Sequence, residues 1–226
     1  MGTNWAADVQ LAVQIDSTCK NSMKVALIKY NAGNVQSVCY ALERLGVEAE
    51  LTDDPEKIRT ADRVIFPGQG EASSAMAYLK ERNLDQVIRE VKQPFLGVCL
   101  GLQLLCTHSE ENDTDCLGIF PVKVKRFIPS VNRQEKVPHI GWNSLENLIE
   151  NPLLKNLPDT KFMYYVHSYY AELGEHSIAT TTYIHDFTAI LNRNNYWAIQ
   201  AHPEKSSTLG EKLMENFLAL PSTQLV

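Results

Sequence analysis

A cysteine between two glycines is the residue with the clearest potential for chemistry in this sequence. Cys99 follows an apolar strand pattern and stands in Gly97-Val-Cys99-Leu-Gly101, after which a helical pattern begins. A nucleophile on a sharp strand-to-helix turn needs such glycines, because a neighbouring Cβ would clash with the tight backbone. The helix start favours a thiolate, and the N–H of Leu100 could donate to an oxyanion. The pattern predicts a nucleophilic Cys99, and the alternative is a buried structural cysteine beside two turn glycines.

A cysteine nucleophile needs a base that a third group orients. The apolar segment 196–201 ends in His202-Pro203-Glu204, where the stiff proline and the i, i+2 spacing let the carboxylate reach the imidazole. We therefore predict that His202 keeps Cys99 ionised and then protonates a leaving group, while Glu204 holds the ring. His139 and His167 are alternative bases, although both contexts are more typical of core or loop histidines.

A glycine-containing loop and a nearby glutamine are candidates for substrate contacts. Pro67-Gly68-Gln69-Gly70 follows the strand pattern 63–66, and ligands of a parallel sheet bind where its strands end. We expect a second oxyanion donor from Gly68, Gln69 or Gly70, whereas the plainer interpretation is a tight turn. Gln103 lies one turn after Cys99 and could bind the polar end of a substrate, or it could be a solvated helix position.

The elements around these residues alternate between strands and helices, which predicts an α/β fold. A doubly wound, mostly parallel sheet with helices on both faces fits this rhythm. The second half changes to short strands, which predicts a mixed or antiparallel C-terminal extension closed by a final helix. The predicted strands are 24–29, 47–51, 63–66, 95–98, 117–126, 136–139, 161–166, 177–184, 187–192 and 196–201, and the predicted helices are 34–45, 72–80, 84–92, 100–108 and 209–220.

Length and composition are those of one globular domain with a sizeable core. The chain has 226 residues and a net charge of -6, which argues against a general nucleic-acid or anionic-membrane surface. It has no apolar stretch of the roughly 20 residues that would span a bilayer. Five cysteines without metal-type spacing predict reduced thiols in a cytoplasm and neither a metal nor a cofactor. Residues 1–22 are predicted to be a tag, a leader or a disordered tail, and residues 23–226 a single domain.

Taken together, these motifs resemble a class I, triad-type glutamine amidotransferase domain, with its flavodoxin-like fold. The resemblance covers nearly all of residues 23–220, with the motifs in the order typical of that family. It implies that Cys99 attacks the side-chain amide of glutamine, with His202 and Glu204 completing the triad. The motifs are Pro67-Gly-Gln-Gly70, Gly97-Val-Cys-Leu-Gly101 with Gln103, and His202-Pro-Glu204.

Within that family the chain is similar to the glutaminase subunits of imidazole glycerol phosphate synthases, which act in histidine biosynthesis. This resemblance implies a heterodimer with a (β/α)₈-barrel cyclase that receives the ammonia. It also implies that the backbone around Ser168 and Tyr169 helps to hold glutamine. Residues at or near the subunit interface would be Asn34, Trp142, Tyr164 and Lys205. The segments that carry the resemblance are 29–38, Pro138-His-Ile-Gly-Trp-Asn143, Tyr164-Tyr-Val-His-Ser-Tyr169 and 201–206.

Two positions depart from the family pattern. Gln69 stands where a small apolar residue is common, so the oxyanion loop could hydrogen-bond differently here. Ala201 stands where an aromatic is often found, which could loosen packing beside His202. Because two glycines make this loop easy to switch, we expect the isolated chain to be nearly inactive until the cyclase docks.

Three other functions are compatible with parts of the pattern. The chain could serve another synthase, for anthranilate, aminodeoxychorismate or pyridoxal phosphate. It could be a stand-alone γ-glutamyl hydrolase or a cysteine peptidase on the same kind of fold. A non-enzymatic binding protein is the third alternative, and the presence of all three triad residues argues against it.

Overall fold

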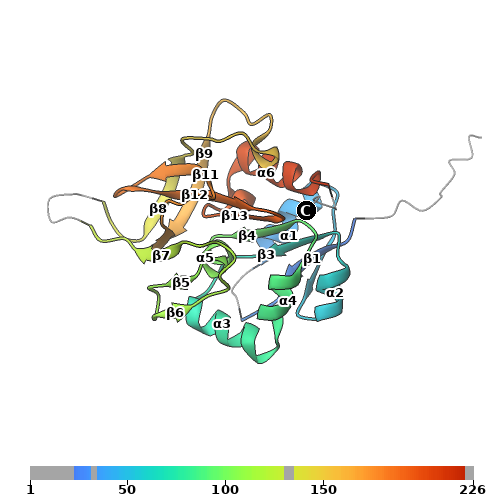
Figure 1. Cartoon of the computed structure of the whole chain (residues 1–226). Coiled ribbons are helices and arrows are strands. Elements are labelled where there is room, and N and C mark those ends of the chain that lie inside the picture. Colours follow the sequence, from blue (N-terminus) through green and yellow to red (C-terminus); the bar gives the residue numbers. More distant parts are fainter. Residues whose placement is uncertain (1–22, 32–34, 130–134, 222–226) are drawn as a thin grey trace, which may run out of the picture.

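The computed structural model describes residues 23–31, 35–129 and 135–221, and a seven-stranded sheet forms its centre (Figure 1). The strand order is β11-β12-β13-β4-β3-β1-β2, so that β4 is the middle strand. The five strands from β13 to β2 are parallel, and β12 and β11 extend one edge with antiparallel pairs. The predicted mostly parallel sheet with an antiparallel extension is confirmed. The strands are β1 (Val25–Ile28), β2 (Ala49–Thr52), β3 (Arg63–Phe66), β4 (Phe95–Val98), β11 (Ser177–Thr182), β12 (Asp186–Arg193) and β13 (Tyr196–Ile199).

The central strands are apolar except for Arg63 at the start of β3, because both faces of the sheet are covered. Every residue of β1, β3, β4 and β13 is buried. Successive side chains point to opposite faces, so Phe66 and Phe95 belong to one hydrophobic cluster while Ile65, Leu96 and Val98 belong to the other. The sheet is thus held between two cores, and the ends of its middle strands have little freedom to move.

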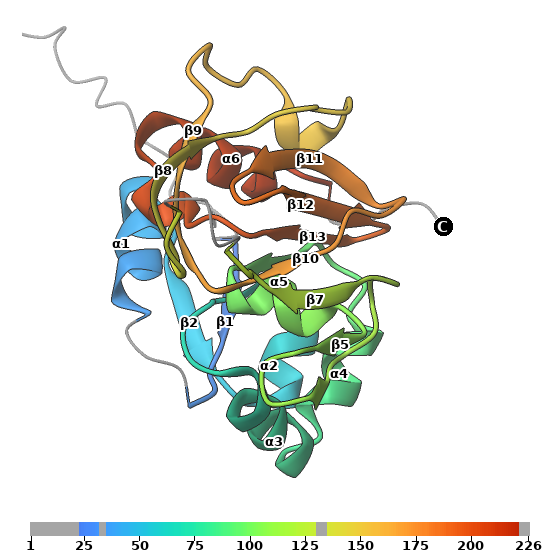
Figure 2. The ribbon, with the colours of Figure 1, turned by 90° about the vertical axis from the view of Figure 1, so that its left-hand side faces the viewer.

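The helices divide between the two faces of this sheet. Helices α1 and α6 pack into one hydrophobic cluster, and α2 to α5 pack into the other. Figure 2 shows α1 and α6 on one side of the strands and α2, α3 and α4 on the other. The predicted doubly wound arrangement is therefore confirmed. The helices are α1 (Gln36–Arg44), α2 (Pro55–Thr60), α3 (Ala72–Glu81), α4 (Leu84–Glu90), α5 (Leu100–Leu105) and α6 (Ser207–Leu218).

Two helices differ from the sequence-based expectation. Helix α2 was not predicted, although Asp54 caps it by accepting a hydrogen bond from the N–H of Glu56. The predicted helix 100–108 was wrong at its end, because α5 stops at Leu105. The following chain folds back and satisfies the last carbonyls: Leu117 N–H donates to Leu104 O at 2.8 Å, and Phe120 N–H donates to Leu105 O at 2.9 Å.

The short strands of the second half do not all join the central sheet. The predicted strand 117–126 was wrong over its first six residues, since only β7 (Lys123–Arg126) forms, and β7 and the predicted strand 161–166 belong instead to two small sheets. The predicted strand 136–139 was wrong, since this strand begins only at His139 and continues to Ser144. One small sheet contains β5 (His108–Ser109), β6 (Thr114–Asp115), β7 (Lys123–Arg126) and β10 (Tyr169–Ala171), and the other is a ribbon of β8 (His139–Ser144) and β9 (Phe162–His167).

Within the described ranges, no helix has both the length and the apolar character that crossing a membrane requires. The tag, leader or tail predicted for residues 1–22 lies outside the described residues. The boundary of the single domain predicted from residue 23 therefore stays a prediction.

Candidate active site

Cys99 occupies a strained turn at the end of the middle strand. Its backbone has φ 49° and ψ -105°, which a non-glycine residue rarely adopts, and α5 begins at the next residue. The turn is held from both sides. Cys99 N–H donates to Ile199 O on β13 at 2.8 Å, and a Cβ on Gly101 would lie 2.3 Å from Phe66 O on β3. The glycine there is thus required by the close approach of the two segments.

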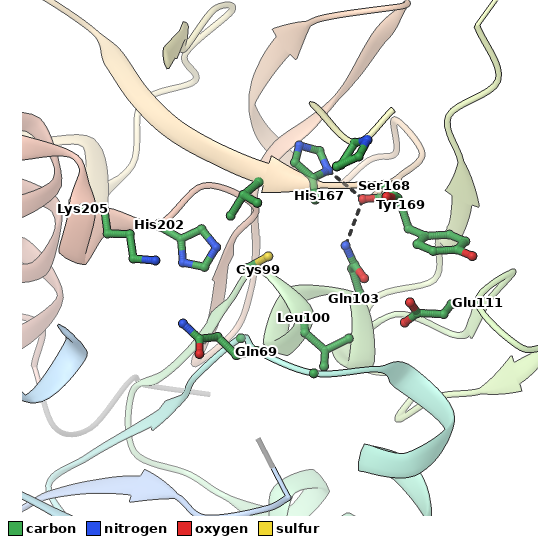
Figure 3. A pocket seen from close by; sticks show the side chains of 14 residues that line it. Gln69, Cys99, Leu100, Gln103, Glu111, His167, Ser168, Tyr169, His202 and Lys205 are labelled. Carbon is green, nitrogen blue, oxygen red and sulfur yellow. Dashed lines mark hydrogen bonds between the residues drawn. The ribbon is translucent and has the colours of Figure 1, made fainter. Parts of the chain in front are cut away.

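The residues predicted to bind substrate meet in one pocket of about 400 Å³ around Cys99 (Figure 3). They come from the loop after β3, the start of α5, the turn between β9 and β10, and the segment after β13. Ligands of parallel sheets bind at such strand ends. The predicted residues that line the pocket are Gly68, Gln69, Gly70, Cys99, Leu100, Gln103, Ser168, Tyr169, His202 and Lys205.

His202 faces Cys99 and is backed by Glu204. Nδ1 of His202 lies 2.8 Å from Oε1 of Glu204, and both side chains are only 3% exposed. A carboxylate can only accept, so Nδ1 carries a proton and Nε2 is left for the thiol. The other oxygen of Glu204, Oε2, is buried with no hydrogen-bond partner among the described residues. The charge of this carboxylate is therefore directed almost wholly at the imidazole.

The surroundings of His202 favour its charged form. Burial lowers the pKa of His202, but the negative charge of Cys99, a side-chain hydrogen bond to Cys99 and the contact with Glu204 outweigh burial. Together they raise this pKa to about 10. An imidazolium at His202 is consequently favoured near neutral pH, and a positive charge beside a thiol favours a thiolate–imidazolium pair.

The two other candidate bases are neutral core histidines. Burial lowers the pKa of His139 to about 4, and burial also lowers that of His167 to about 3. His167 Nδ1 lies 2.7 Å from Tyr169 O, and His167 Nε2 lies 3.1 Å from His139 Nδ1. Both rings pack with Phe127 and Phe187. Their interpretation as satisfied core residues is confirmed, although His167 also touches the pocket wall.

A tyrosine that was not singled out in the sequence holds the oxyanion loop. The hydroxyl of Tyr30 lies 2.7 Å from Pro67 O and 2.9 Å from Gln69 O, and it accepts from Gln69 N–H at 3.2 Å. Tyr30 is buried against Phe66. A backbone N–H that donates to this hydroxyl is not directed at Cys99. Leu100 N–H, at the first residue of α5, has no acceptor within the helix and is positioned to donate to a group bound beside Cys99.

Two further residues near the nucleophile were also missed. Glu111 lines the pocket across from His202, and its carboxylate accepts from Ala72 N–H at 2.8 Å (Figure 3). Burial raises the pKa of Glu111. Gln200 is fully buried beside Cys99. The segment of Glu111 carries no pattern that distinguishes it, whereas Gln200 could have been found from its place at the end of a strand, two residues before His202.

Two of the residues predicted at a subunit interface lie on the β8–β9 ribbon, and a third borders the pocket. Trp142 on β8 is 55% exposed and pairs across the ribbon with Tyr164 on β9. Their rings make an edge contact with centroids 6.0 Å apart. Lys205 is exposed and borders the pocket beyond His202. Asn34 lies outside the described residues.

The fold and this site define a class of protein, which comparison with known families identifies. The family described as glutamine amidotransferase class-I matches residues 26–220. The chain is 53% identical to the imidazole glycerol phosphate synthase subunit HisH of Bacteroides fragilis strain YCH46, over 88% of this chain and 100% of the relative. It is 50% identical to the subunit of the same name from Bacteroides thetaiotaomicron, with the same coverage. The chain therefore belongs to the class-I glutamine amidotransferase family, within its group of HisH subunits.

Solved structures agree on the fold. The crystal structure of a glutamine amidotransferase superposes with a TM-score of 0.63 at 20% identity, covering 85% of this chain and 96% of that protein. At this identity the likeness establishes the shared architecture alone.

The thiolate–imidazolium pair predicts selective alkylation of Cys99. Iodoacetamide at pH 7 should label Cys99 at least ~10-fold faster than Cys39, Cys106 or Cys116, as measured by peptide mass spectrometry. Burial raises the pKa of each of these three comparison thiols, to about 12 for Cys116. Because the pKa of His202 is raised to about 10, its positive charge persists beside Cys99 at pH 6 while the other three thiols lose their thiolate forms, so the selectivity should increase when the pH is lowered to 6.

His202→Asn is the matched control for this labelling. It removes the imidazolium but keeps a polar side chain, so labelling of Cys99 at pH 7 should fall toward the rate of Cys39. Labelling that does not change in a folded His202→Asn protein would show that His202 does not hold the charge of Cys99.

Proposed function

We propose that this chain hydrolyses glutamine with the triad Cys99, His202 and Glu204, and that it supplies the ammonia to the cyclase subunit of an imidazole glycerol phosphate synthase in histidine biosynthesis. One observation carries the proposal. A nucleophilic cysteine on a strained turn faces a buried His–Glu pair, in a chain 53% identical to a HisH subunit along nearly its whole fold.

The reaction follows from the charges of the triad. The Cys99 thiolate attacks the side-chain carbonyl of glutamine, and the oxyanion forms near Leu100 N–H. The C–N bond breaks as the imidazolium of His202 gives its proton to the leaving nitrogen, which departs as ammonia. Water then attacks the glutamyl thioester, His202 takes a proton from it, and the C–S bond breaks to return the thiolate and release glutamate. Glu204 stabilises the imidazolium at both stages.

The pocket offers separate groups for the two ends of the amino acid. Both N–H groups of the Gln103 amide have acceptors, Tyr169 O at 2.9 Å and Gln200 Oε1 at 3.3 Å. Its carbonyl oxygen is left on the side of Glu111 (Figure 3). This oxygen and the Glu111 carboxylate suit the α-ammonium of glutamine, which would offset the cost of burying that carboxylate. The backbone around Ser168 and Tyr169 completes the substrate contacts.

An apolar face of the β8–β9 ribbon suits the cyclase. Side chains alternate along the ribbon, so Ile140, Trp142, Phe162 and Tyr164 share its outer face while His139 and Tyr165 are buried. Ile140, Trp142 and Phe162 are each at least half exposed. Such a patch beside a pocket is typical of a protein interface. Lys205 and Asn34 are proposed to lie at the same contact.

The cyclase is proposed to be a (β/α)₈ barrel that forms a heterodimer with this chain. It uses the ammonia to convert a phosphoribulosyl formimino carboxamide nucleotide into imidazole glycerol phosphate and an aminoimidazole carboxamide ribonucleotide. A cytoplasmic location, without cofactor, nucleic acid or membrane, stays a prediction from the sequence.

Glutaminase activity that depends on both Cys99 and the cyclase tests the proposal. Wild type and Cys99→Ala are each assayed for glutamate and ammonia, with and without a histidine-pathway cyclase and its nucleotide ligand. We expect activity only from wild type with the cyclase, and a loss of at least ~1000-fold in Cys99→Ala, since the covalent intermediate cannot form.

Two outcomes would contradict parts of this proposal. Full activity of wild type without any cyclase would favour another synthase subunit or a stand-alone γ-glutamyl hydrolase. Activity that survives in Cys99→Ala would remove Cys99 as the nucleophile. Ser73→Ala, in α3, serves as a control for nonspecific effects of substitution.

Tyr30→Phe tests whether the loop after β3 limits the isolated chain. The variant keeps the buried ring but loses the hydroxyl that accepts from Gln69 N–H. One net hydrogen bond is worth about 1 kcal/mol. Releasing the loop should therefore raise cyclase-independent glutaminase activity by about fivefold. The exposed Tyr40→Phe is the matched control, and unchanged or lower basal activity in a folded Tyr30→Phe protein would show that Tyr30 does not restrain the loop.

A further inference from the structure

The register of two parallel strands places a glutamine directly beside the nucleophile. Ile199, the last residue of β13, pairs with Val98, the last residue of β4. The next residue on each strand is Gln200 and Cys99, so these two lie side by side at the same sheet edge. Gln200 N–H donates to Ala189 O at 2.8 Å, which fixes the backbone, and the whole residue is inaccessible to solvent. Its side chain therefore has few positions available.

The amide of Gln200 directs its N–H group at the sulfur. Nε2 lies 3.6 Å from Cys99 Sγ, and Oε1 lies 3.3 Å from Gln103 Nε2. The hydrogen-bond network determines which end of the Gln200 amide is the nitrogen and which is the oxygen. Tyr169 O can only accept, so the Gln103 atom 2.9 Å from it must be its amide nitrogen. The Gln200 atom facing that nitrogen must then be an oxygen, and the N–H group is left for Cys99.

We propose that Gln200 is a further catalytic residue, whose N–H stabilises the Cys99 thiolate both before attack and when it leaves the glutamyl thioester. This role rests on the proposed function of the site. When the thioester is hydrolysed, the water oxygen bonds to the acyl carbon, the C–S bond breaks with its electron pair on Sγ, and the water proton goes to His202. Gln200 transfers no proton and only stabilises the charge on sulfur.

A neutral donor at this position complements His202. The charge of His202 changes during the cycle, because it loses its proton to ammonia and regains one from water. Gln200 presents the same N–H to the sulfur whether His202 is charged or neutral, because its hydrogen bond with Gln103 fixes the orientation of its amide. Since the amide is uncharged, it stabilises the thiolate without competing with the imidazolium for Glu204.

The test measures the pH dependence of Cys99 alkylation, together with glutaminase turnover. Gln200→Met keeps a similar volume but has no donor. Gln200→Glu keeps the acceptor for Gln103 and replaces the N–H by a carboxylate oxygen. The pH midpoint of iodoacetamide labelling should rise by about one unit in Gln200→Met, which removes a hydrogen bond to a charged group, and further in Gln200→Glu, which also places a negative charge beside the sulfur. Turnover with the cyclase should fall about tenfold or more.

Controls separate this role from a structural one. Gln93→Met removes a partly buried amide that donates to Ile58 O, far from the site, and should leave the midpoint unchanged. If Gln200 merely fills the core, its variants will lower the melting temperature while the midpoint stays at the wild-type value, and the proposal fails. If Gln200→Met does not fold, Gln200→Glu decides by the same criterion. If the midpoint shifts in the Gln200 variants but the wild type hydrolyses no glutamine with the cyclase, the role at sulfur holds and the proposed function is overturned instead.

Discussion

The alignment of β4 with β13 is the constraint on which the site depends. These two neighbouring parallel strands end at the same level, and each is followed directly by residues of the proposed active site. Cys99 follows one strand, and Gln200 and His202 follow the other. Because parallel strands expose all their carboxyl ends at one edge, residues about a hundred positions apart become adjacent without any long connecting loop. A shift of one residue in this register would move Gln200 away from Cys99 and turn every side chain of β13 to the opposite face.

The two hydrophobic cores explain why this edge tolerates strain. A left-handed backbone at a cysteine costs on the order of 1–3 kcal/mol, so it persists only where the surroundings allow nothing else. The middle strand is buried on both faces, and its end is bonded to β13 and pressed against β3. The strained conformation holds the thiol at the N-terminus of α5, where the N–H groups of the first helical turn have no partner within the helix and stabilise negative charge.

Local patterns were enough to single out Cys99, His202 and Glu204, whereas contacts between distant segments hid other parts of the pocket. The turn at Cys99 is encoded by adjacent glycines, and the His202–Glu204 pair by an i, i+2 spacing, so each could be read within a few residues. Tyr30 contacts the loop after β3 and Glu111 contacts the start of α3, each about forty positions away, and nothing in their own segments indicates those partners. The end of α5 was hidden for the same reason, since residues 117–120 stop the helix from outside. The missed α2 is different, because Asp54-Pro55-Glu56 is a local N-terminal signal that could have been recognised.

The ribbon of β8 and β9 connects the proposed interface to the base through backbone atoms. Tyr164 presents its ring on the exposed face, while its carbonyl accepts from His202 N–H at 2.9 Å and its N–H donates to Ser206 Oγ at 2.9 Å. The hydroxyl of Ser206 in turn donates to His202 O at 2.5 Å. A partner that shifts β9 would therefore shift His202 with it, whereas the loop after β3 is held separately by Tyr30. The proposed base and the loop after β3 are thus anchored to different elements, so a partner that contacts both the ribbon and the loop would act on both at once.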